Sequence, residues 1–114
     1  MKWTNYLKFT LFFAVFCVIS LMSLLPPKHI ELGSSDKFSH FLAYFVLILT
    51  YGYWRHKKYH AILGIVAFIC YGVLLELLQG LVPGRVPSFL DCIANSLGVL
   101  IGSTILQLRK KLSL

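Results

Sequence analysis

Long apolar stretches separated by short polar segments make up nearly all of the chain. They predict helices at about residues 9–25, 37–54, 61–82 and 89–108. Pro26 and Pro27 end the first stretch, and the segment Pro83-Gly84-Arg85-Val86-Pro87 makes a sharp corner between the last two. Each stretch reaches or approaches the ~17–25 residues that cross a bilayer as a helix. The pattern therefore predicts an all-α membrane protein, a four-transmembrane-helix bundle.

The composition supports this fold class. Hydrophobic residues form 58% of the 114 residues, and the mean hydropathy is +0.78. A soluble domain of this size cannot bury so much apolar surface. We expect residues 1–114 to form a single integral membrane domain. The first stretch also fits a signal peptide, but it exceeds the ~7–15 residues of an h-region and lacks a small-x-small cleavage site, so we interpret it as a retained helix.

The positive charge is placed as in a multi-pass membrane protein. The net charge is +7, and most of the basic residues lie in three clusters: Lys2 and Lys8; Arg55, Lys57 and Lys58; and Arg109, Lys110 and Lys111. Basic residues favour the cytoplasmic ends of transmembrane helices. The N and C termini and the loop at 55–60 are therefore predicted to be cytoplasmic, and 26–36 and 83–88 to face outward. A nucleic-acid partner would need a solvated basic face and is not expected.

Polar side chains gather in one layer of the predicted bundle. At ~1.5 Å of rise per residue, Tyr44, Glu76 and Asn95 lie roughly 9 Å inside the outer boundary. The shallower members of the layer are His40, Gln79, Arg85 and Asp91.

Helical spacing places these side chains on shared faces. Asp36, His40 and Tyr44 are spaced i, i+4, i+8, and Asp91 and Asn95 are four apart. Small residues extend two of the faces: Gly72 and Gly80 beside Glu76, and Ala94, Gly98 and Gly102 beyond Asp91. Small residues let helix backbones approach closely. The pattern therefore predicts an inward-facing polar pocket formed by three helices and open to the outside.

Some of these side chains also have structural explanations. Asp36 can cap a helix, and Asp91 can do so through a capping box with Ser88. Lys37 can extend to the headgroups. Gln79 and Asn95 can tie helices together at ~0.6 kcal/mol each. These alternatives stay open on the sequence alone.

Glu76 and His40 are harder to explain in this way. An acid at the centre of a transmembrane helix costs ~2.5–3.5 kcal/mol, and a glutamine would tie helices together at lower cost. We therefore expect both side chains to have a function. The loop histidines are expected to be solvated: His29, His56 and His60. The cysteines have no CxxC spacing, so neither a disulfide framework nor a zinc site is expected, and they are interpreted as buried apolar filler: Cys17, Cys70 and Cys92.

A set of motifs runs in order from Asp36 to Gly102, over half of the chain. The set consists of Asp36-Lys37-Phe38-Ser39-His40-Phe41-Leu42-Ala43-Tyr44, Glu76-x-x-Gln79, Pro83-Gly84-Arg85, Ser88-x-x-Asp91, Asn95, Gly98 and Gly102. Together these motifs resemble the VanZ-like membrane protein family. The resemblance implies a small bacterial membrane protein related to the cell envelope, because the family is named after a member linked to teicoplanin (glycopeptide) resistance. It implies no settled reaction. The pattern residues are Asp36, Lys37, His40, Tyr44, Glu76, Gln79, Arg85, Asp91 and Asn95.

Three functions are compatible with these residues. The first is a multi-pass protein of the bacterial cytoplasmic membrane whose pattern residues bind an envelope lipid headgroup or a peptide-like ligand in the outer leaflet. The second is a structural or assembly module whose polar network fixes helix packing. The third, and least favoured, is an enzyme acting on an envelope lipid, with His40, Glu76 and Asp91 as candidate acid–base residues or ligands of a divalent ion. No metal or cofactor is assigned, and the oligomeric state stays open.

Overall fold

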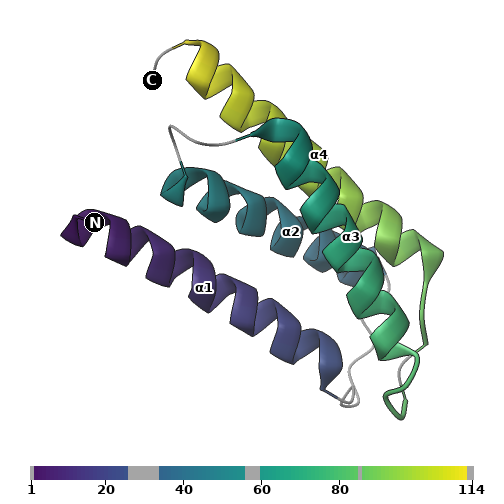
Figure 1. The fold of residues 1–114 in the computed structure, drawn as a ribbon. Coiled ribbons are helices and arrows are strands. Elements are labelled where there is room, and N and C mark those ends of the chain that lie inside the picture. The colour runs from purple at the N-terminus through teal and green to yellow at the C-terminus, as the bar shows by residue number, and fades with distance from the viewer. Residues whose placement is uncertain (1, 26–33, 56–59, 85, 113–114) are drawn as a thin grey trace.

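The computed structural model describes residues 2–25, 34–55, 60–84 and 86–112, and its regular elements within these ranges are all helices. Four helices follow one another along the chain (Figure 1): α1 Trp3–Leu24, α2 Ser34–Trp54, α3 Ala61–Gln79 and α4 Phe89–Lys111. The all-helical fold predicted from the apolar pattern is confirmed.

The helix ends differ from the predicted ones for local reasons. α1 begins at Trp3 rather than near 9, because nothing in its polar lead breaks a helix. α4 continues to Lys111, where basic side chains oppose the negative end of the helix dipole. α3 ends at Gln79 rather than 82, and the backbone continues in tight turns whose N–H groups bond three residues back.

The corner between α3 and α4 depends on a glycine. Gly84 has a φ of 83°, a conformation that residues with a Cβ rarely adopt. A proline followed by a glycine with positive φ is the pattern of a type II turn, and Pro83 and Gly84 provide it. After this turn the chain returns toward α3, where Pro87 packs next to Gly80.

The helices alternate in direction, so that the N and C ends of the chain lie at the same end of the bundle (Figure 1). α2 and α4 run in the same direction and form the most extensive helix pair. α4 also packs on α3, and α1 packs on α2 and less on α3. The main contact therefore joins two parallel helices that are distant in the chain, while the antiparallel neighbours α1 and α2, and α3 and α4, also pack on each other.

Glycines on α4 let it approach α2 to backbone contact. A Cβ built on Gly98 would overlap the carbonyl oxygen of Phe41 and lie 2.9 Å from the amide nitrogen of Phe45. One turn further, a Cβ on Gly102 would overlap the side chain of Ile48. The predicted ridge of small residues is therefore the surface on which α2 packs.

The apolar core lies between α2, α3 and α4, and no described residue of α1 is buried. The core residues are Tyr44, Leu47, Ile48, Phe68, Val99 and Leu106. α1 is attached by aromatic contacts, in which the ring of Phe12 stacks on Trp54 and meets Phe68 edge-on.

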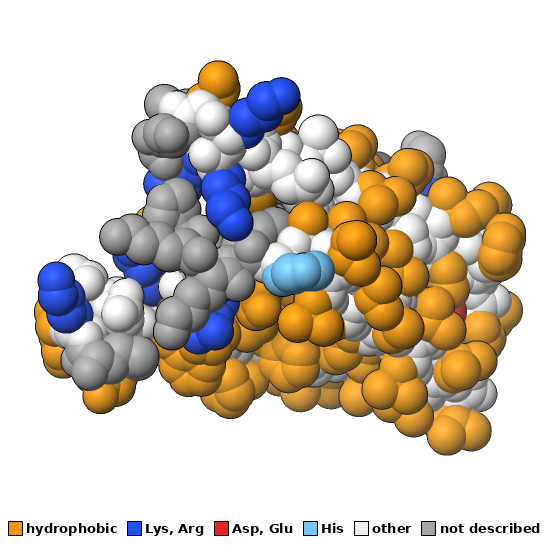
Figure 2. Space-filling view, turned by 45° about the horizontal axis from the view of Figure 1, so that its top comes forward, with side chains coloured by type: hydrophobic (Ala, Val, Ile, Leu, Met, Phe, Trp, Pro, Cys, Tyr) orange, Lys and Arg blue, Asp and Glu red, His pale blue; other side chains and the backbone are white. Residues whose placement is uncertain are grey.

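The surface has the distribution expected of a membrane protein. Over the part of the chain that the structure describes, three helices, α1, α3 and α4, are long and apolar enough to cross a membrane. In the view of Figure 2, Lys and Arg side chains gather toward the end that holds the chain termini, and hydrophobic side chains cover most of the rest. Cys17 and Cys70 are exposed on this apolar surface, which corrects the expectation that they fill buried positions.

We expect Gly98→Ala to lower the free energy of unfolding by about 1–3 kcal/mol, because the added methyl group meets backbone atoms of α2 that cannot move independently. The measurement is unfolding of the purified protein in detergent. Gly72→Ala is the control, since its methyl group would lie 3.2 Å from the tip of the Tyr44 ring and 3.4 Å from the Asn95 amide nitrogen, two side chains that can adjust. Equal losses in both variants would contradict backbone contact between α2 and α4.

Candidate functional site

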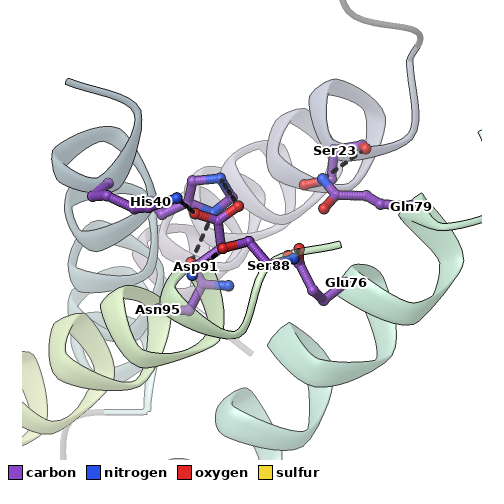
Figure 3. Close-up of polar contacts among 8 residues, drawn as sticks. Ser23, His40, Glu76, Gln79, Ser88, Asp91 and Asn95 are labelled. Carbon is purple, nitrogen blue, oxygen red and sulfur yellow. Dashed lines mark hydrogen bonds and ion pairs between the residues drawn. The ribbon is translucent and has the colours of Figure 1, made fainter. Parts of the chain in front are cut away.

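Polar side chains from α2, α3 and α4 meet at the end of the bundle opposite the chain termini. They come from the first turns of α2, the last turns of α3 and the first turns of α4 (Figure 3). Because α2 and α4 start at the same end and run in parallel, their first turns are brought together.

Asp91 of α4 lies between two basic side chains of α2. One of its carboxylate oxygens forms an ion pair with the Lys37 ammonium group, and the other lies 3.5 Å from His40 Nε2. The Asp91 side chain is 9% exposed, whereas those of Lys37 and His40 are 38% and 17% exposed. A nearly buried carboxylate is therefore covered by two cation-forming groups that reach the surface.

His40 also contacts the next polar residue of α4. Its Nδ1 lies 3.0 Å from the amide oxygen Oδ1 of Asn95. Carboxylate and amide oxygens accept hydrogen bonds, so a ring that donates to both carries both of its protons, and a neutral ring donates to only one. His40 therefore connects Asp91 and Asn95, two polar side chains that lie one turn apart on α4.

The start of α4 is capped from two sides. Ser88 precedes the helix, and its hydroxyl accepts a hydrogen bond from the Asp91 backbone N–H at 3.4 Å. The Ser88 backbone N–H donates to Glu76 Oε1 of α3 at 2.6 Å. In a capping box the acidic residue of the helix itself would take this N–H. Since Glu76 accepts it instead, the Asp91 carboxylate is available to Lys37 and His40.

Gln79 joins α3 to α1. Its side-chain Nε2 donates to the backbone carbonyl of Ser23 at 2.9 Å, and the residue is 5% exposed. A second bond joins the same helices deeper in the bundle, between the hydroxyl groups of Ser20 and Tyr71. Gln79 thus holds helices together, as the structural explanation proposed.

Tyr44 lies below the charged residues, in the centre of the helix triplet. It is 2% exposed, and its ring tip and the Asn95 amide nitrogen both pack over Gly72. A side chain at position 72 would occupy the space that these two groups share. The predicted face of α2 that carries His40 and Tyr44 therefore points toward α3 and α4.

The structure brings most of the predicted pattern residues together. Lys37, His40, Asp91 and Asn95 form one connected cluster, called here the α2–α4 cluster, and Tyr44 adjoins it. Glu76 bonds to the Ser88 backbone rather than to this cluster. Arg85 and the side chain of Asp36 lie outside the described residues.

Several contacts could not be found from the sequence. The carbonyl of Ser23 and the pair of Ser20 and Tyr71 were not singled out, although a hydroxyl in an apolar helix is a signal for a bond between helices. His60, expected in a loop, caps α3 by accepting the Leu63 N–H at 3.3 Å.

Within the described ranges, no group of three or more His, Cys, Asp or Glu side chains is arranged to hold a metal ion.

The bond between Glu76 and Ser88 predicts different effects for two substitutions. Glu76→Ala leaves a backbone N–H at the start of α4 without its acceptor, and we expect it to lower the free energy of unfolding by about 1–3 kcal/mol. Glu76→Gln retains an oxygen acceptor and should lose clearly less. Thermal unfolding of both variants in detergent measures the difference. Equal losses would mean that the negative charge, rather than the acceptor, stabilises the corner.

The chain was compared with known proteins. It matches the VanZ/LLP1 family over residues 2–110, which is nearly its whole length. No curated protein and no solved structure matches the chain. The matched region contains α1, α2 and α3, all of α4 except its last residue, and every residue of the α2–α4 cluster. The chain therefore belongs to the VanZ/LLP1 family.

Proposed function

We propose that the chain is a four-span protein of the bacterial cytoplasmic membrane with both termini in the cytoplasm. In this proposal the α2–α4 cluster binds the headgroup of a cell-envelope lipid in the outer leaflet. The observation that carries it is the partial exposure of Lys37 and His40 above the nearly buried carboxylate of Asp91.

The topology is supported by the helices and by the charges. α2 is not among the three helices that are apolar enough by themselves to cross a membrane, but it has 21 residues and lies along the 23-residue α4. A span by α4 therefore implies one by α2. The basic residues at the start of α1, the end of α2 and the end of α4 favour the cytoplasmic side for that end.

The polar residues divide into two groups with different exposure. Glu76 and Gln79 are each 5% exposed and bond to backbone groups of other segments, which suits a structural role. Lys37 and His40 are more exposed than a purely structural ion pair requires. Ion pairs that reach the surface contribute only ~0–1 kcal/mol to stability, so stability alone is a weak reason for placing one here.

The chemistry of the cluster matches a headgroup with an anionic and a hydrogen-bonding part. The Lys37 ammonium group can bind a phosphate or carboxylate oxygen, and His40 and Asp91 can bind a hydroxyl or an amine. Arg85 lies outside the described residues, but the sequence places it at the adjoining corner, where its guanidinium group would suit the same anion. A lipid is favoured over a peptide-like ligand because the helices around the cluster expose apolar side chains to the membrane.

A structural module is the second candidate. It is favoured by the hydrogen bonds of Glu76 and Gln79, both of which join separate segments of the chain. In that case the α2–α4 cluster would serve to align two parallel helices, and loss of function would follow loss of stability in every variant.

The test compares lipid binding with stability in variants of the cluster. We expect Lys37→Met to reduce the phospholipid that co-purifies with the protein several-fold, because it removes the ammonium group of a partly exposed side chain, with a change in unfolding temperature of only a few degrees. Lys37→Arg, which keeps the cation, should retain most of the lipid. Mass spectrometry of extracted lipid and thermal unfolding in the same detergent provide the two measurements.

Gln79→Leu is the matched structural control. It removes the bond between α3 and α1 and leaves the cluster intact, so it should lower stability without a specific loss of lipid. Susceptibility of cells to envelope-active antibiotics, scored at equal membrane abundance, should follow Lys37 and not Gln79. If lipid content and antibiotic susceptibility change only in proportion to the loss of stability across all three variants, the structural module is correct and the binding proposal is wrong.

A further inference from the structure

An apolar groove runs between α1 and α2, with a cavity volume of about 480 Å³. Its α2 wall is formed by Ser39, Leu42, Ala43 and Val46, and its α1 wall by aliphatic side chains that include Ala14 and Val18. Among the described residues that line it, Ser39 is the one with a polar side chain. The volume lies within the ~300–1,000 Å³ typical of pockets for small ligands.

The groove exists because α1 is held to different helices at its two halves. Near its start, the ring of Phe9 packs on Trp54 at the end of α2. In its second half, Ser20 bonds to Tyr71 and the Ser23 carbonyl accepts from Gln79, so this half is attached to α3. Small side chains at Ala14 and Ala43 then leave space between α1 and α2.

The groove begins at the level of the α2–α4 cluster. Ser39 lines it and directly precedes His40, which faces α4. From Ser39 to Val46 the α2 wall extends inward by about 10 Å along the helix. A lipid chain in the groove would therefore have its headgroup near the start of α2, where the partly exposed Lys37 pairs with Asp91 of α4.

The lining of the groove selects the kind of occupant. A peptide segment carries N–H and C=O groups that need partners, and an unpaired one costs several kcal/mol in an apolar environment. Apart from Ser39, the lining residues that the structure describes offer only aliphatic side chains. An acyl chain has no such groups and buries apolar surface along the whole wall.

We propose that the groove between α1 and α2 binds an acyl chain of the phospholipid whose headgroup contacts the α2–α4 cluster. This inference rests on the proposed function and narrows its ligand to a lipid with a chain seated in this groove. The groove then supplies apolar contact area, and the cluster distinguishes the headgroup.

The test uses phosphatidylglycerol with a photoreactive diazirine in one acyl chain, mixed into vesicles that contain the purified protein. After illumination, mass spectrometry locates the labelled residues. We expect more labelling on the groove walls than at equally exposed positions of α3 and α4. The labelling of the groove should fall several-fold in Val46→Phe, because the phenylalanine ring fills the groove. Val46 is 37% exposed, so the larger side chain should be tolerated.

Val73→Phe is the matched control, since Val73 is 41% exposed and lies on α3 away from the groove. It should leave the labelling of the groove unchanged. Val18→Phe, on the α1 wall, is a second variant that should act like Val46→Phe. Unfolding temperatures of all three variants show whether each remains folded.

The outcomes separate this inference from the proposed function. Labelling in proportion to exposure on all four helices would overturn the groove site, even if Lys37→Met still loses co-purifying phospholipid and the headgroup site stands. A second outcome is that labelling concentrates in the groove but Lys37→Met changes neither this labelling nor the amount of co-purifying phospholipid. That outcome would overturn the link between groove and cluster. Loss of groove labelling in both Val46→Phe and Lys37→Met supports one lipid bound at both places.

Discussion

The backbone contact between α2 and α4 is the constraint on which the candidate site depends. Gly98 lies against the carbonyl oxygen of Phe41, and this closeness aligns the first turns of two helices that are separated by more than thirty residues of chain. Asp91 can reach Lys37 and His40 only because the helices meet in this register. A larger residue at position 98 would separate the backbones of α2 and α4 and move Asp91 away from Lys37 and His40.

The bilayer explains why the polar residues are distributed as they are. In an apolar environment a buried polar group needs a partner within the protein. Glu76 and Gln79 meet this need by bonding to the backbone of other segments, at the corner before α4 and at the end of α1. These bonds fix the frame of the site and leave Asp91 for the two basic side chains of α2.

The fold was largely predictable from the sequence, because apolar stretch length, proline and the small-residue ridge each have a direct physical meaning. The common location of His40, Asp91 and Asn95 was also predictable, since helical rise and spacing set depth and face. The partner of each polar group was not. That Glu76 bonds to the Ser88 backbone depends on the path of the corner, and that α2 packs chiefly on α4 depends on how four helices share their faces. The four-span topology and the cytoplasmic termini stay predictions.

The way α1 is attached has a consequence for assembly. Its Ser20 hydroxyl donates to the carbonyl of Phe16 within the same helix at 2.8 Å, so it already has an acceptor before any other helix is present. Tyr71, its partner on α3, is synthesised about fifty residues later. α1 has no buried residue, and its Ser20 hydroxyl has an acceptor within the same helix. α1 can therefore enter the membrane as an independent helix before the later helices are present. Its bonds to α3 can form only after that helix has been made, so the groove between α1 and α2 takes its final shape only when α3 has joined the bundle.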